Sequence, residues 1–214
     1  MRKILFTAIL ATLLSSFLFG QTDDTKSRAI LNKVSAKAKS FKNMKFSFTY
    51  VMTDKKNKIN DTLQGKIVMS GNKFNLDFMN RKIISDGKTV WTYDPDAEEV
   101  QINTVKEDQD AFNPGKLLTA YDKSFRSKLI KTINVKGRQY HIIDLYPKKG
   151  KAYYKIRLKI DKKDMRVVKG TVYNKDNVIY SYIVKKFESN ITLPANYFTF
   201  DPKKYPDTEV VDLR

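Results

Sequence analysis

Residues 83 to 95 decide the fold, and they read Ile83-Ile84-Ser85-Asp86-Gly87-Lys88-Thr89-Val90-Trp91-Thr92-Tyr93-Asp94-Pro95. Asp86-Gly87 is a strong hairpin signal, because glycine adopts positive φ angles without strain and aspartate tolerates them better than most residues. β-branched and aromatic residues flank this signal, and Asp94-Pro95-Asp96 forms a second turn. A third alternating segment follows at 99–105. The sequence therefore predicts a three-stranded antiparallel meander that contains the only tryptophan.

Upstream of this meander, apolar residues recur first at helical and then at strand spacing. A helix is expected to start at Asp24 or Thr25, with an apolar stripe made of Ile30, Leu31, Val34, Ala38 and Phe41. Residues 44–53 then alternate between apolar and polar, and further strands are expected at 63–69 and 74–78. Downstream, the pattern predicts strands at 140–146, 153–160, 167–173, 178–187 and 197–200. Strand spacing near ten residues, with turn signals between, predicts a single antiparallel meander.

The segment from Lys106 to Lys131 interrupts the strand pattern. Asn113-Pro114-Gly115 is expected to start a short helical piece that carries Leu117, Leu118 and Tyr121, and a second piece is expected around Phe125 and Leu129. Two interpretations stay open for this segment. It is a lid over the sheet, or it is a structural crossover that closes one end of the sheet.

The predicted fold class is α+β, mainly β. So long a sheet must curl, close or be covered, and the expected helices are too few to cover it. We therefore expect a curved, incompletely closed antiparallel β-barrel with an N-terminal helix and a short helical lid over a hydrophobic cavity. No linker rich in Gly, Ser or Pro divides the chain, so residues 21–214 are expected to form a single domain.

The first 20 residues are typical of a signal peptide. Arg2 and Lys3 precede an apolar segment from Ile4 to Phe19, and Gly20-Gln21 is a plausible cleavage point. The alternative is an uncleaved membrane anchor. We disfavour it because the apolar segment is too short to span a bilayer, which takes about 20 apolar residues.

Composition excludes several kinds of chemistry. The chain has no cysteine and one histidine, His141, so the usual zinc sites are excluded, and we expect neither a metal nor a cofactor. His141 lies in a strand-like alternation without a nearby Ser or Cys motif. Asp86, Asp94 and Asp96 could be viewed as acid–base carboxylates, but aspartate is favoured in such turns for geometry alone. We therefore do not expect an enzyme.

The net charge of +18 predicts attraction to anionic partners. The lysines are scattered over strands and turns, and no nucleic-acid-binding motif is present, so no nucleic acid partner is expected. Most of this basic surface is interpreted as simply solvated. Part of it could meet an anionic membrane surface.

Large, soft and aromatic side chains gather on one face of the predicted sheet. They have two interpretations: an ordinary core under a helix, or a cavity in which flexible thioethers and rings repack around a variable hydrocarbon chain. Within residues 88–93, it stays open whether the even-numbered or the odd-numbered side chains face inward. The candidate cavity residues are Phe46, Phe48, Tyr50, Met52, Ile67, Met69, Phe74, Leu76, Phe78 and Trp91, with Leu117, Leu118 and Tyr121 as the candidate lid.

The amino-acid sequences of several segments resemble those of the outer-membrane lipoprotein carrier family (LolA-like). The motif S-D-G-K-x-x-W-x-Y-D-P at residues 85–95 is the specific one. Weaker matches in the same order are Ser40-Phe41 with Phe48-Thr49, residues 71–76, Asn113-Pro114 with Leu117-Leu118, and Phe198-Thr199-Phe200-Asp201-Pro202 with Val210-Val211-Asp212.

This resemblance implies a monomeric periplasmic carrier without enzymatic activity. It would hold acyl chains of lipoproteins in a hydrophobic cavity and ferry them from an inner-membrane lipoprotein-releasing transporter toward the outer membrane. Proteobacterial members carry an Arg-Pro pair that latches the lid, where this chain has Gly71-Asn72. The alternative is a periplasmic lipid- or glycolipid-binding, or envelope-stress-sensing, module on the same scaffold.

Overall fold

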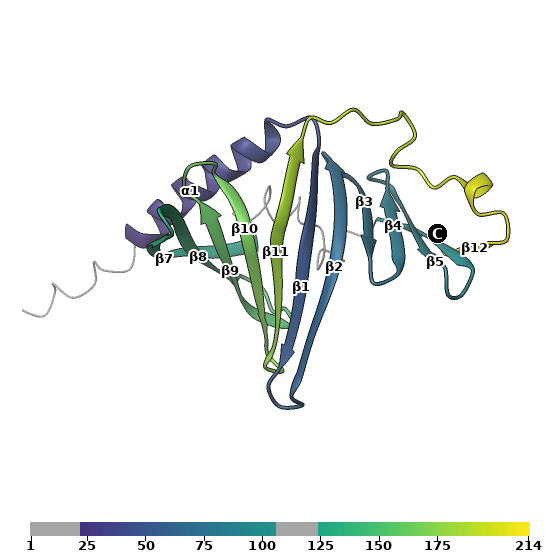
Figure 1. Cartoon of the computed structure of the whole chain (residues 1–214). Coiled ribbons are helices and arrows are strands. Elements are labelled where there is room, and N and C mark those ends of the chain that lie inside the picture. The colour runs from purple at the N-terminus through teal and green to yellow at the C-terminus, as the bar shows by residue number, and fades with distance from the viewer. Residues whose placement is uncertain (1–21, 106–123) are drawn as a thin grey trace, which may run out of the picture.

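The computed structural model describes residues 22–105 and 124–214, which form one helix of several turns and a large sheet (Figure 1). Of the described helices, none is long and apolar enough to cross a membrane. The elements are α1 (Thr22–Lys39), β1 (Met44–Asp54), β2 (Ile59–Ser70), β3 (Lys73–Phe78), β4 (Arg81–Ser85), β5 (Thr89–Asp94), β6 (Glu99–Thr104), β7 (Phe125–Val135), β8 (Arg138–Pro147), β9 (Tyr153–Asp161), β10 (Arg166–Asn174), β11 (Val178–Ser189), the short 3₁₀ helix η2 (Pro202–Lys204) and β12 (Glu209–Asp212).

The strands form one sheet in the order β12-β6-β5-β4-β3-β2-β1-β11-β10-β9-β8-β7. The sheet is mainly antiparallel, curved and open, which confirms the predicted class. The prediction of a single meander is wrong in its connectivity, because β1 pairs with β11 and so joins two meanders, β1–β6 and β7–β11. β12 pairs with β6 in parallel at one edge.

The predicted hairpin at Asp86-Gly87 is confirmed, and it joins β4 to β5. Gly87 has a φ angle of +94°, which a residue with a side chain rarely adopts. One carboxylate oxygen of Asp86 accepts hydrogen bonds from the backbone N–H groups of Lys88 at 2.8 Å and Thr89 at 2.7 Å. Partial burial raises the pKa of Asp86, but these two bonds, together with the charge of Lys73 and the backbone N–H of Asp86 itself, lower it below its ordinary value. The sequence signal thus works through side-chain capping as well as through glycine.

Two other predicted elements are wrong. Residues 125–129 are not helical, because they begin strand β7, which pairs with β8. Residues 197–200 form turns rather than a strand, and the last strand is β12. Phe200 of this segment packs on the sheet instead of joining its edge.

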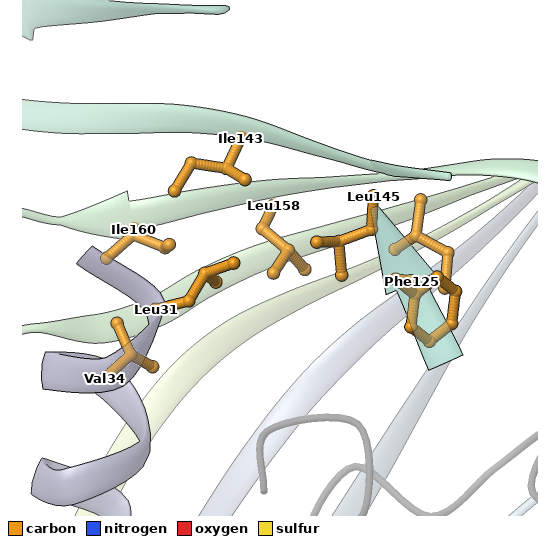
Figure 2. Packing of buried hydrophobic residues seen from close by; sticks show 8 residues of the cluster. Leu31, Val34, Phe125, Ile143, Leu145, Leu158 and Ile160 are labelled. Atoms are coloured by element: carbon orange, nitrogen blue, oxygen red, sulfur yellow. The ribbon is translucent and has the colours of Figure 1, made fainter. Parts of the chain in front are cut away.

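Alternation gives the sheet two faces, which we call inner and outer. The inner face is the one against which α1 packs: Leu31 and Val34 contact a cluster of fully buried residues from β7, β8 and β9 (Figure 2). The cluster is Leu31, Val34, Phe125, Ile143, Leu145, Ile156, Leu158 and Ile160. This helix-on-sheet layer is the largest cluster of buried apolar residues in the described chain.

The outer face has its own small cluster at the other end of the sheet. Ile84 of β4 and Val100 of β6 pack there with Phe200 from the segment that precedes η2. The backbone of the same segment is tied to β3, because the Asn75 side chain donates a hydrogen bond to the carbonyl of Tyr197 at 3.2 Å. Residues 197–205 therefore cover the outer face of β3–β6.

Candidate functional site

Eight of the ten predicted cavity residues come together on the inner face of β1, β2 and β3. Phe48, Ile67, Met69 and Leu76 are buried there, each with at most 4% of its surface exposed. Phe46, Tyr50, Phe74 and Phe78 are half-buried and pack against those four. We call these eight residues, together with Ile83 and Tyr182, the inner-face apolar surface.

Strand register explains why these residues meet. Phe46 lies opposite Ile67, which lies opposite Leu76, so three apolar side chains cross three strands in one row. Met69 and Phe74 form a neighbouring pair in the next row. Successive side chains of a strand alternate between the two faces, and residues directly opposite each other in neighbouring strands share a face. All of these side chains therefore lie on one side of the sheet.

Aromatic rings dominate the exposed part of this surface. Phe78 lies between Phe48 and Tyr50, with ring centroids at 5.5 Å and 5.3 Å respectively. Tyr182 of β11 approaches Tyr50 to 5.3 Å and Phe48 to 6.1 Å. Burial is the main reason why the pKa of Tyr182 is raised above its ordinary value, so this ring sits in an apolar environment.

Two predicted residues stand apart. Trp91 is wrong as a member of this surface: it lies opposite Ile84 and packs with the outer-face cluster of Ile84, Val100 and Phe200. Leu76, in contrast, lies opposite Ile83, so neighbouring residues of β4 point to opposite faces. Met52 has the inner-face parity of Tyr50 but lies one row beyond the cluster, opposite Tyr180.

Sequence reasoning missed Ile83 and Tyr182. Ile83 was not proposed, and the sequence gives no signal for it, because Ile83 and Ile84 are both apolar and pack on different faces. Tyr182 belongs to the predicted strand at 178–187, whose pattern alternates clearly. What the sequence lacked was the pairing of β11 with β1, which brings Tyr182 directly opposite Tyr50.

Helix α1 covers the two halves of the inner face to different extents. The main contacts of α1 are with β7 and β10, and its apolar side chains seal the cluster of Leu158 and Ile160. Within the described ranges, no helix has comparable contacts with β1–β4. The candidate lid residues Leu117, Leu118 and Tyr121 lie outside the described residues.

The titratable groups that the sequence suggested for chemistry have structural roles here. Asp94 forms an ion pair with Arg81 at 2.6 Å, Asp96 accepts a hydrogen bond from Asn80, and Asp86 caps its turn. His141 is buried, with its Nδ1 atom 2.9 Å from the Thr132 hydroxyl. The described residues contain no cluster of three or more potential metal ligands.

Comparison with known proteins places the chain in a family. The sequence matches the family "Outer membrane lipoprotein carrier protein LolA" over residues 39–201. No curated protein matches the sequence. Among solved structures, an uncharacterized conserved protein from Thermus thermophilus superposes with a TM-score of 0.60 at 12% identity, covering 87% of this chain and 99% of that one. A domain assigned to outer membrane lipoprotein sorting, from Vibrio parahaemolyticus, gives a TM-score of 0.51 at 11% identity and covers 83% and 97%.

These two structures share the fold of this chain, and the family match covers its sequence from the end of α1 to the segment on the outer face. The chain therefore belongs to the LolA outer membrane lipoprotein carrier family.

Proposed function

We propose that this protein is a periplasmic carrier that binds the acyl chains of lipoproteins and ferries them toward the outer membrane. The observation that carries this proposal is the inner-face apolar surface, where Phe46, Tyr50, Phe74 and Phe78 stay only partly buried although each is large and apolar or aromatic. An apolar patch of this kind on a globular domain marks a binding surface. Family membership supports acyl chains as the ligand.

The energetics suit a carrier rather than a permanent holder. Burying a 16-carbon acyl chain yields about 12 kcal/mol of gross transfer free energy at about 0.8 kcal/mol per methylene. The protein side adds less to this free energy, because the partly buried aromatic side chains have already lost part of their contact with water before cargo binds. Aromatic and thioether side chains such as Phe78 and Met69 also repack around chains of different length. Cargo can then be released at its destination.

The remaining parts of the proposal rest on the sequence and on family membership. Residues 1–20 act as the signal peptide that delivers the chain to the periplasm. Leu117, Leu118 and Tyr121, which lie outside the described residues, are the proposed lid residues. Cargo comes from an inner-membrane lipoprotein-releasing transporter, and the carrier works as a monomer without enzymatic activity.

The proposal is tested with a triacylated lipopeptide and two matched variants. Phe74→Glu places a carboxylate in the inner-face apolar surface, and burying an unpaired charge is costly, so lipopeptide binding should fall at least tenfold. Tyr154→Glu makes the same kind of change at an aromatic residue of β9 that is 48% exposed and does not belong to this surface, from which β10 separates it in the sheet order. It should bind as well as the parent.

Binding is measured by fluorescence of a labelled lipopeptide in detergent-free buffer, and folding of each variant is checked by circular dichroism. Equal binding by a folded Phe74→Glu variant would contradict the assigned surface. Binding of free glycolipid or fatty acid, but not of lipopeptide, would favour the lipid- or glycolipid-binding alternative.

A further inference from the structure

The outer face of β7–β10 carries an array of basic side chains. Strand register places Lys128 of β7 opposite Asp144 of β8, and places Lys131 opposite Ile142, which in turn lies opposite Lys159 of β9. Because alternate residues of a strand share a face, the neighbours of these lysines complete the array. We call it the basic outer face: Arg126, Lys128, Lys131, Lys155, Lys159 and Lys169.

Both carboxylates of this region are already neutralised. Asp144 is 1% exposed and accepts two hydrogen bonds from Arg157, at Nε and at Nη2, each 2.7 Å long. Asp161, also 1% exposed, forms an ion pair with Arg138 and caps its own turn through the N–H groups of residues 163 and 164. Within the described ranges, no carboxylate lies within ion-pair distance of the six basic outer-face residues.

One pair in this array opposes stability. Lys159 and Lys169 lie directly opposite each other in neighbouring strands, and like charges in that position destabilise a sheet. Lys159 also stacks over the ring of Tyr140, with its Nζ atom 3.9 Å from the centroid, so its charge is held in place on the outer face. A sheet optimised for stability alone would put an acidic residue opposite one of them. An anionic partner that binds across the strands would remove the repulsion.

The residues between these charges resemble those found at a membrane surface. Lys155 stacks over Tyr173 at 4.2 Å, Tyr154 beside it is 48% exposed, and Ile130 and Val135 at the β7 edge are 38% and 40% exposed. Tyrosine is enriched where proteins meet the lipid headgroups. The basic side chains come from three strands, β7, β9 and β10, instead of lining one groove, and this arrangement fits an extended anionic surface better than a single peptide strand.

We propose that the basic outer face docks the protein onto the anionic phospholipid headgroups of a bilayer. It lies on the opposite side of the sheet from the inner-face apolar surface, so docking leaves the latter free and the protein can hold cargo while attached. This inference does not depend on acyl-chain binding. Each basic residue near an anionic surface strengthens binding about fivefold, and the attraction weakens with salt because exposed charges are screened.

The test is sedimentation of the purified protein with vesicles of phosphatidylcholine alone or with about one third phosphatidylglycerol. The parent should bind only the anionic vesicles and should be released by salt. Changing Lys128, Lys131, Lys159 and Lys169 together to glutamine should weaken binding at least tenfold, and changing the same four to arginine should preserve it. The matched control removes four exposed lysines from the β2–β6 half: Lys66, Lys73, Lys88 and Lys203.

The control variant loses the same net charge but should bind within about threefold of the parent. Lipopeptide binding should be the same in all variants, which separates this test from that of the proposed function. Equal losses in both glutamine variants would overturn the proposal, because net charge alone would then account for binding. Equal binding to neutral vesicles, or salt-sensitive binding to DNA without binding to anionic vesicles, would overturn it as well.

Discussion

The ring of Phe48 lies over Gly65 of the neighbouring strand, and a Cβ atom at position 65 would come within 2.3 Å of its Cζ atom. The two residues are direct partners in the pairing of β1 with β2. The absence of a side chain at position 65 therefore makes room for a ring that is 4% exposed and that anchors the inner-face apolar surface.

Gly65→Ala should therefore displace the Phe48 ring and destabilise the protein by about 1–3 kcal/mol, the usual cost of overpacking. Gly170→Ala is the matched control, because it also lies inside a strand and its Cβ atom would make only an ordinary 3.9 Å contact with Leu158. Urea denaturation of both variants measures the difference. Equal stability of the two variants would contradict this account of the Phe48 position.

Trp91 should report on the outer face alone. It is the only tryptophan, and it packs with Ile84, Val100 and Phe200. Saturation of the inner-face apolar surface with a non-fluorescent lipopeptide should leave its emission maximum unchanged. Phe200→Ala, which empties part of the outer cluster, should shift the emission to the red and cost about 3–5 kcal/mol of stability. A shift on lipopeptide binding in the parent would place Trp91 at the ligand.

His141 should make stability depend on pH in a narrow range. Burial, followed by the nearby charge of Lys162, lowers the pKa of His141 below its ordinary value of 6.5. The unfolded chain therefore takes up a proton near pH 6.5 that the folded chain binds only at lower pH, so stability falls as the pH decreases through this range. Carboxylates titrate near pH 4 in the unfolded chain and contribute little here.

This prediction is checked by urea denaturation at pH 7.5 and pH 5.5 in the parent and in His141→Gln. The parent should lose stability between the two values, and the variant should lose less. Parallel losses would show that other groups cause the dependence.

The sequence predicted local elements well where alternation separates an apolar face from a polar one. In β1, Phe46, Phe48 and Tyr50 alternate with Lys45, Ser47 and Thr49, and both the strand and its inner face follow from that pattern. β5 lacks such a contrast. Its outer face is covered by residues 197–205, so Trp91 and Tyr93 are packed there, and the parity of the strand could not be decided from the sequence.

The β7 strand was misread for a different reason. The inner-face position between Phe125 and Leu129 is the polar Ser127, so the two apolar residues are four apart, a spacing that imitates a helix. The register against β8 then shifts between Leu129 and Lys131, so Ile130 interrupts the alternation. The pairing of β1 with β11 was also beyond the sequence, because it joins segments more than 120 residues apart along the chain.

The most direct test of the central claim is photocrosslinking with a lipopeptide whose acyl chain carries a diazirine, followed by mass spectrometry of the labelled peptides. The account predicts labels on the inner-face apolar surface, at residues such as Phe46, Phe78 and Tyr182, and strong competition by unlabelled lipopeptide. Labels confined to Trp91 and Tyr205 on the outer face, or labelling that unlabelled lipopeptide does not reduce, would contradict the account.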